Sequence, residues 1–175
     1  MTTGAGSVGS FRIGQGFDAH AFAPDRPLVL GGVTIAHDRG LAGHSDGDPL
    51  LHAIADAILG AVALGDIGQH FPSSDDRFAE MDSTELVRFA LRGAQEAGWE
   101  PVNLDATLIA QAPPLAVHLE QMRRTIAPLL DVPLDAVSVK AKTTDHLGAL
   151  GRAEGIAALV VVLLSRRPEP ARAAN

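Results

Sequence analysis

The sequence predicts an α+β fold, a two-layer sandwich in which helices cover one face of a mixed β-sheet. The expected elements follow one another as strand, hairpin, two helices, strand, helix and two strands, an order typical of this class. The last strand is apolar on both faces, which indicates a central position or a subunit interface. No linker or internal repeat divides the chain. We therefore expect one domain over residues 11–166, between a flexible tail at 1–10 and a frayed tail at 167–175.

The N-terminal strands are predicted by residue type and by the turn between two of them. Phe11–His20 is expected to be the first strand, and it carries two closely spaced glycines. Leu28–Leu30 and Val33–Ile35 flank a Gly-Gly pair, which predicts a β-hairpin. The sheet formed by these and later strands has a face that the helices leave uncovered, and we expect symmetric copies of the chain to cover it.

Two helices with polar loops before them fill the middle of the chain. A polar loop over Gly40–Asp48 precedes Pro49–Leu64, whose apolar residues recur with helical spacing. A second polar loop over Gly65–Asp76 is followed by an amphipathic helix over Ser83–Ala97. Ser83 is the expected N-cap of this helix, because its hydroxyl can accept from a free backbone N–H of the first turn.

The C-terminal part is expected to hold three strands and a helix. Asn103–Gln111 is a strand, and Leu115–Leu129 is a helix that should end near Pro128. Ala136–Thr143 alternates apolar and polar residues as a half-buried strand does. Glu154–Leu164 is the strand that is apolar on both faces.

The composition excludes several kinds of protein. The 175 residues contain no cysteine, which excludes disulfides, thiolate zinc sites, iron–sulfur clusters and a cysteine nucleophile. The net charge of −7 argues against binding nucleic acid over a wide surface. No apolar run approaches the roughly 20 residues of a membrane span, and no secretory signal precedes the first strand. A cytoplasmic location is the default expectation.

Asp18, His20 and His52 form a candidate metal site. Residues two apart in a strand point to the same side, so the side chains of Asp18 and His20 should converge. If Asp48 caps the helix that follows it, His52 lies about one turn in and Asp56 one turn further on the same face. Two histidines and a carboxylate are typical of catalytic zinc, and Asp56 could orient His52 as a second carboxylate. An ordinary structural role for these residues is about equally compatible with the pattern.

Three further polar segments each have a functional and a structural interpretation. Gly65–Gly68 and Phe71–Asp75 could line a phosphate or polyol pocket, or form plain polar turns. The lysines of Lys140–Asp145 could bind an anion, or only keep an edge strand soluble. Arg152 and Glu154, bracketed by glycines, could bind an anion or pair with each other.

Several segments together resemble the 2-C-methyl-D-erythritol 2,4-cyclodiphosphate synthases, a family of the non-mevalonate isoprenoid pathway. The segments run in order over nearly the whole chain, and their ordered combination is specific although each alone is weak. They are Arg12-Ile-Gly-Gln-Gly-Phe-Asp-Ala-His20, Gly43-His-Ser-Asp-Gly-Asp48 with His52 and Asp56, Ala63-Leu-Gly-Asp-Ile-Gly68, Ala110-Gln-Ala-Pro113, Lys140-Ala-Lys-Thr143, Gly151-Arg152 and Glu154-Gly155.

The resemblance implies a phosphorus–oxygen lyase that converts 4-diphosphocytidyl-2-C-methyl-D-erythritol 2-phosphate to 2-C-methyl-D-erythritol 2,4-cyclodiphosphate. The 2-phosphate attacks the β-phosphorus and CMP leaves, a reaction that needs in-line positioning more than a strong base. The resemblance also implies a homotrimer with its sheets around a central axis and active sites between adjacent subunits. Zinc would be held by Asp18, His20 and His52. A second divalent ion, magnesium or manganese, would bind the substrate phosphates and Asp145.

Individual roles are implied in the same way. His44 and Thr143 would steady the transition state by hydrogen bonds. Arg152 and Glu154 would lie near the trimer axis, where family members have an apolar channel that can take isoprenoid phosphates. The residues expected to contact the substrate are Ser45, Asp66, Ile67, Gly68, Phe71, Pro72, Ser73, Ser74, Asp75, Ala110, Gln111, Ala112, Pro113, Pro114, Leu115, Ala116, Lys142, Thr144 and Arg152.

The chain departs from the family pattern mainly around the expected cytidine diphosphate. Pro114 and His146 stand where the family usually has Lys, Asp145 where it has Glu, Ala149 where it has an aromatic residue, and Ala153 where it has Gly. One lost charged contact typically costs about 1.5–3 kcal/mol. Nucleotide affinity is therefore less firmly predicted than the zinc site, and His146 or Lys142 could compensate.

Two other functions stay open at this point. A related zinc enzyme could hydrolyse a phosphoester or diphosphate, because the same metals can activate water. A trimer that binds isoprenoid phosphates without turnover is the second alternative. The complete Asp-His-His trio argues against the latter, since a vestigial site has no reason to keep three metal ligands.

Overall fold

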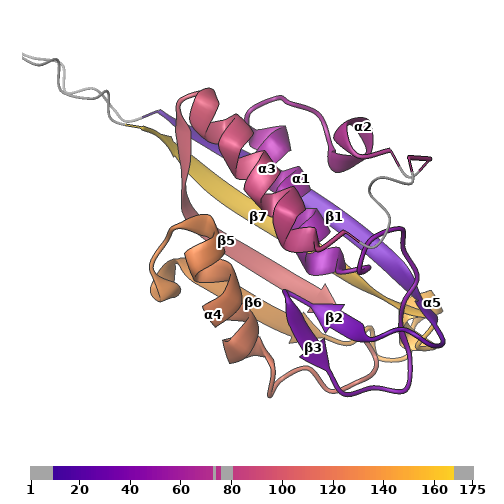
Figure 1. The fold of residues 1–175 in the computed structure, drawn as a ribbon. Coiled ribbons are helices and arrows are strands. Elements are labelled where there is room, and N and C mark those ends of the chain that lie inside the picture. The colour runs from indigo at the N-terminus through magenta and orange to yellow at the C-terminus, as the bar shows by residue number, and fades with distance from the viewer. Residues whose placement is uncertain (1–9, 73, 76–80, 168–175) are drawn as a thin grey trace, which may run out of the picture.

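The structure, a computed structural model, describes residues 10–72, 74–75 and 81–167. A five-stranded mixed sheet in the order β4-β1-β7-β5-β6 forms one layer, and the longer helices form the other (Figure 1). This confirms the predicted α+β class. The tails predicted at 1–10 and 167–175, apart from residues 10 and 167, lie outside the described residues, as does Ser73. Among the described residues, no helix combines the length and apolar character that crossing a membrane requires.

The elements follow the predicted order, with short additions. The strands are β1 (Phe11–Ala23), β2 (Leu28–Leu30), β3 (Val33–Ile35), β4 (Gly40–Leu41), β5 (Trp99–Ile109), β6 (Val137–Lys142) and β7 (Gly155–Arg166). The helices are α1 (Pro49–Ala61), α2 (Ile67–His70), α3 (Ser83–Glu96), α4 (Leu119–Leu130) and α5 (Gly148–Gly151), with a 3-10 turn at Leu134–Ala136. Strand β4, helices α2 and α5 and the 3-10 turn are not predicted from the sequence, because each spans no more than four residues.

Strand β7 is the centre of the sheet. It pairs antiparallel with β1 on one side and with β5 on the other, and β5 pairs parallel with β6. Its even-numbered residues from Ile156 to Leu164 are buried beneath the helices. The central position predicted from its apolar composition is confirmed. The helices bury only the residues on one face of β7. Apolar residues on its other face, such as Leu159 and Val161, stay partly exposed.

Two glycines let α1 lie directly on β1. A Cβ atom built on Gly14 would lie 1.7 Å from the carbonyl oxygen of Ala57, and one on Gly16 would lie 1.9 Å from that of Ala53. Both are helix backbone atoms, so no side-chain adjustment could relieve the overlap. The glycines noted in the first strand therefore set the distance between the strand and the helix.

Several predicted boundaries are corrected. Helix α1 ends at Ala61 instead of Leu64, because Ala63 adopts a left-handed conformation with φ of 59°. Helix α4 begins at Leu119, after a turn, and continues through Pro128 to Leu130. The proline lies close enough to the C-terminal end that the helix stops soon after it, at the left-handed residue Asp131. The predicted Gly-Gly hairpin turn is confirmed, with φ of 60° and 71°.

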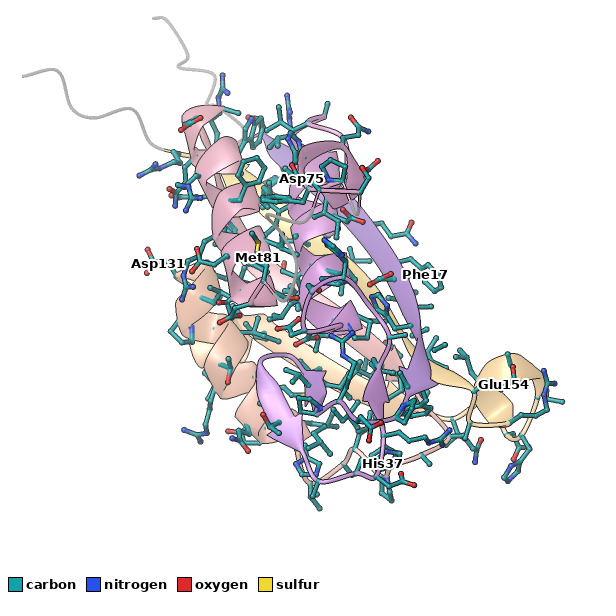
Figure 2. The ribbon with its side chains drawn as sticks, turned by 45° about the vertical axis from the view of Figure 1, so that its right-hand side comes forward. Phe17, His37, Asp75, Met81, Asp131 and Glu154 are labelled. Atoms are coloured by element: carbon teal, nitrogen blue, oxygen red, sulfur yellow. The ribbon has the colours of Figure 1, made fainter. Side chains whose placement is uncertain are left out.

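The face of the sheet opposite the helices is partly apolar and uncovered. On β1, Ile13 and Phe17 are 72% and 59% exposed, and Figure 2 shows Phe17 projecting from β1 away from the helices. On β7, Leu159 and Val161 are 37% and 42% exposed and lie beside them. We call these four residues the open apolar patch. Toward β5 and β6 the same face becomes polar, where Lys140 pairs with Asp105.

Candidate active site

The strand β1 and the helix α1 bring the three predicted metal ligands together. Asp18 and His20 are two residues apart on β1, on the face that holds Gly14 and Gly16 and is covered by α1. His52 lies in the first turn of α1 and is buried. The close approach that the glycines permit is what places the His52 ring beside the strand.

The donor atoms of the trio converge on one point. Asp18 Oδ2 lies 2.8 Å from both His20 Nε2 and His52 Nδ1, and these nitrogens are 3.1 Å apart. Four ligands about 2.0–2.1 Å from a tetrahedral ion are about 3.3 Å apart, so an expansion of a few tenths of an ångström would fit one. The donor set, two imidazole nitrogens and a carboxylate oxygen, suits zinc and leaves a fourth position for a ligand.

Hydrogen bonds and charge link the three side chains of the trio. Burial raises the pKa of Asp18, but hydrogen bonds and charge from His20 and His52 outweigh it and hold that pKa well below its usual range. The hydrogen bond with Asp18 raises the pKa of His20, against the opposing effect of burial. The carboxylate is therefore ionised and ready to bind a cation at neutral pH.

The side of His52 away from Asp18 is held by two hydroxyl groups. Ser45 Oγ and Ser83 Oγ each lie 2.9 Å from His52 Nε2. The prediction that Asp56 orients His52 is wrong, because Asp56 Oδ1 accepts instead from the N–H of Ile67, at 2.8 Å. Asp56 lies on the predicted face and lines the same pocket, but its hydrogen bond fixes the start of α2.

Ser83 differs from its prediction in a way that matters for the site. Asp82 is the N-cap of α3, and its side chain accepts from the N–H of Thr84. The Ser83 side chain, one residue further on, turns inward and is fully buried. Serine is a common cap, so the sequence alone predicts a capping role for Ser83. Asp82 lies directly before it and is an equally good cap. This neighbour is the feature of the sequence that indicates another role for Ser83.

The loop before α1 is held by its neighbours at several points. The Arg26 guanidinium donates to the carbonyl oxygens of Gly43, at 2.6 Å, and Ser45. The predicted cap Asp48 is confirmed, since its Oδ1 accepts from the N–H groups of Leu50 and Leu51. These contacts present His44 and Ser45 to the site from a fixed backbone.

A pocket of about 350 Å³ opens in front of the trio, within the size range of small-molecule sites. The predicted residues that line it are Asp18, His20, His44, Ser45, His52, Asp56, Ile67, Gly68 and Phe71. Met81 and Leu86 also line it and were not predicted, because isolated apolar residues give no functional signal. Figure 2 shows Met81 beside the lower end of α3. It shows Asp75 above Met81, near α2. His44 Nε2 lies 3.1 Å from the carbonyl oxygen of Asp75.

Other residues of the predicted polyol segment are not among those that line this pocket, or lie outside the described residues. Asp66 caps α2, with its Oδ1 accepting from the N–H of Gln69 at 3.0 Å. Pro72 and Ser74 are exposed. Ser73 is not among the described residues.

The predicted nucleotide segment forms a second pocket, of about 250 Å³. Its lining residues are Ala110, Gln111, Pro113, Pro114, Leu115, Ala116, Ala141, Lys142 and Thr143, and a cis peptide bond joins Ala112 to Pro113. Thr143 therefore lies apart from His44, with which it was expected to act. Thr144 donates from its hydroxyl to the carbonyl oxygen of Leu147, and Asp145 is exposed.

Strand register separates the nucleotide segment from the trio. Ala19, Ala157, Ile109 and Lys142 form one row across β1, β7, β5 and β6, which is three strand spacings or about 14 Å. Lys142 shares the sheet face of Ala19, whereas Asp18, one residue away, faces the helices. The Lys142 side chain of one chain therefore lies three strands away from the trio, on the other face of the sheet.

Three of the departures from the family pattern adopt left-handed conformations, in the turns on either side of α5. Asp145, His146 and Ala153 have φ of 52°, 64° and 54°, in the left-handed region that costs L-residues about 1–2 kcal/mol each. The N–H of His146 donates to Gln111 Oε1 at 3.2 Å, which ties this turn to the nucleotide segment. Arg152 and Glu154 pair with each other at 2.6 Å on an exposed surface, close to α5.

The buried cap of α1 predicts a pH-dependent stability. Burial raises the pKa of Asp48 to about 6, against the hydrogen bonds it accepts from Gly32 and other backbone N–H groups. The folded state then holds a proton that the unfolded state releases, so the free energy of unfolding should fall as pH rises from about 4 to about 6. Asp48→Asn should make this slope shallower in urea denaturation, whatever its absolute stability. Asp82→Asn, which changes an exposed cap, should keep it. Equal slopes in the two variants would contradict the assignment.

Comparison with known proteins adds to this geometry. The family described as the YgbB family matches residues 11–165. The chain is 55% identical over 157 residues to 2-C-methyl-D-erythritol 2,4-cyclodiphosphate synthase of Bacillus cereus, a match that covers 90% of this chain and 99% of that protein.

Solved structures share the fold. The bifunctional IspDF from Campylobacter jejuni superposes with a TM-score of 0.87 at 44% identity, over 90% of this chain and 43% of that one. The IspF of Plasmodium falciparum, solved as a CDP complex, has a TM-score of 0.80 at 32% identity, over 93% of this chain and 100% of that one.

Proposed function

The chain belongs to the YgbB family, with the 2-C-methyl-D-erythritol 2,4-cyclodiphosphate synthases, and from this we propose the following reaction. It converts 4-diphosphocytidyl-2-C-methyl-D-erythritol 2-phosphate to 2-C-methyl-D-erythritol 2,4-cyclodiphosphate. The substrate's 2-phosphate oxygen bonds to the β-phosphorus, the bond to the α-phosphate breaks, and CMP leaves. The observation that carries this proposal is the Asp18, His20 and His52 trio at a pocket of small-molecule size.

The trio fits a zinc ion by donor type and by spacing, and zinc is the metal we propose for it. A second divalent ion, magnesium or manganese, is proposed on the substrate phosphates with Asp145. When bound, these ions neutralise charge on the attacking and leaving oxygens. The nucleophile is already anionic, so the residues of this chain have mainly to bind and orient the substrate.

Each pocket is assigned one half of the substrate. The pocket in front of the trio would hold the methylerythritol part, with Ile67, Gly68 and Phe71 along its wall. His44 is held by the Asp75 carbonyl at the rim and is proposed to donate to a phosphate oxygen. The second pocket would hold the cytidine diphosphate, with Lys142 and Thr143 near its phosphates; the CDP complex of the Plasmodium falciparum relative supports a cytidine nucleotide.

A trimer would complete the site. Within one chain the second pocket lies about three strand spacings from the trio, so an adjacent subunit would be needed to bring a second pocket to the trio. The open apolar patch would be covered by the same assembly, with the sheets around a central axis. Arg152 and Glu154 would lie near that axis, and an isoprenoid phosphate could bind in the channel between the subunits.

The assembly predicts the effect of a charge on the open apolar patch. Val161→Glu should prevent assembly, because the glutamate charge would be buried without a partner between the subunits. Light scattering should then give the mass of one chain, and turnover should stop. Leu64→Glu replaces a residue of similar exposure, 40% against 42%, on the helical side. It should keep the mass of three chains. A Val161→Glu protein with that mass would contradict the assembly.

Phosphorus NMR tests the reaction itself. The protein is incubated with the diphosphocytidyl substrate, zinc and magnesium. CMP together with the cyclic diphosphate is expected, and would make Pro114, Asp145, His146 and Ala149 tolerated variations. CMP with a linear product would favour the hydrolase. Zinc binding without turnover would favour the binding protein for isoprenoid phosphates.

A further inference from the structure

A buried hydrogen-bond chain leads from Asp46 through Ser83 to His52, on the side of the ring away from the metal site. Ser83 is fully buried at the start of α3. Its hydroxyl donates to Asp46 Oδ1, and its backbone N–H donates to Asp46 Oδ2 at 3.1 Å. The same hydroxyl oxygen lies 2.9 Å from His52 Nε2. One carboxylate thus accepts from both hydrogen-bond donors of Ser83.

The chemistry of these groups fixes the direction of the hydrogen bonds. A carboxylate only accepts, and a serine hydroxyl has one hydrogen, so Ser83 gives that hydrogen to Asp46. Its oxygen can then only accept from His52, which requires a hydrogen on Nε2. In a neutral imidazole the lone pair is then on Nδ1, the atom that faces Asp18 and His20.

We propose that Asp46 and Ser83 are positioning residues that hold the Nε2–H form of His52 and so direct Nδ1 to the metal. The inference rests on the proposed function, since it requires the trio to bind a metal ion. Ser45 lies at the same distance from Nε2 and accepts from the N–H of Gly47, which leaves the direction of its own hydrogen open. The carboxylate of Asp46 is what makes the arrangement directional.

Two variants of the full chain test this. Asp46→Asn replaces the side chain with one of nearly the same volume. If the amide oxygen still accepts from the Ser83 N–H, the amide NH2 group faces the Ser83 hydroxyl. The Ser83 hydroxyl oxygen must then accept from this NH2 group. The hydroxyl hydrogen turns toward His52 Nε2, where it conflicts with the hydrogen on that nitrogen. Ser83→Ala removes the acceptor altogether. We expect zinc affinity, measured by competition with a chromophoric chelator, to fall about ten- to a hundredfold in each.

A spectroscopic measurement separates positioning from general weakening of the fold. In the zinc-loaded protein with 15N-labelled histidine, the proton on His52 Nε2 should give a downfield, slowly exchanging signal. In both variants this signal should move upfield or be lost to exchange. The control is Asp82→Ala, which removes the cap beside Ser83 and weakens the same helix end. It should keep both the signal and the zinc affinity.

Each outcome is decisive. Unchanged zinc affinity and an unchanged Nε2–H signal in Asp46→Asn would overturn the inference, even if Ser83→Ala failed to fold. An equal loss of affinity in Asp82→Ala would also overturn it, because helix stability alone would then explain the effect. A wild-type protein that binds no zinc would contradict the proposed function as well, so the two failures are distinguishable.

Discussion

His52→Gln is expected to abolish zinc binding and to reduce CMP release at least about 10²- to 10³-fold, the loss typical when one charge-stabilising group is removed from a site. The side chain is 6% exposed and both of its ring nitrogens are engaged. The loss of the ring therefore leaves the metal site with one ligand fewer, Asp18 and His20 being the two that stay. Glutamine keeps a polar side chain of similar length but does not offer the imidazole nitrogen that zinc prefers.

Zinc content by elemental analysis and CMP release by chromatography give the two readouts. His118→Gln is the matched control, because His118 precedes α4 and its side chain makes no capping hydrogen bond there. It should retain full zinc content and turnover. A His52→Gln protein with one zinc per chain and wild-type turnover would exclude the proposed metal site.

Gly16→Ala is expected to destabilise the protein by about 3 kcal/mol or more, the upper range for overpacking a core. The added Cβ would lie 1.9 Å from the carbonyl oxygen of Ala53 and 2.9 Å from the backbone nitrogen of Ala57. Helix α1 must therefore move away from β1. Since His52 lies on α1 and Asp18 on β1, the same movement should weaken zinc binding.

Thermal unfolding and chelator competition measure the two effects. At about 2–4 °C per kcal/mol for a chain of this size, the midpoint should fall by about 6–12 °C. Gly60→Ala is the control in the same helix, where the nearest atom is the Gln15 carbonyl oxygen at 4.0 Å. It should stabilise the protein by about 0.5–1 kcal/mol, because alanine favours a helix over glycine. A Gly16→Ala protein as stable as Gly60→Ala would show that the strand and helix can separate without cost.

Much of the metal site was predictable from local sequence rules. The spacing of Asp18 and His20 follows from the two-residue period of a strand, and the position of His52 from the cap at Asp48. The apolar composition of β7 likewise predicted either a central place or a subunit interface, and the structure has it at the centre of the sheet. Such rules succeed because each depends on one element and its immediate neighbours along the chain.

The remaining features of the site depend on contacts between residues far apart in the sequence. Asp56 has the right helical spacing to reach His52, yet the N–H of Ile67 is its partner, because the loop after α1 folds back onto the helix. Ser83 reaches His52 across 31 positions, which no spacing rule could indicate.

The residues of this sequence by themselves determined the longer elements, the metal trio and the family resemblance, since these are recorded in local pattern and residue type. Tertiary structure alone decided that Ser83 and Asp46 lie behind His52 and that Lys142 of the nucleotide segment lies three strands from the trio, on the other sheet face. Both depend on strand register and on the packing of α1 and α3. These are set by the whole core and not by any one segment.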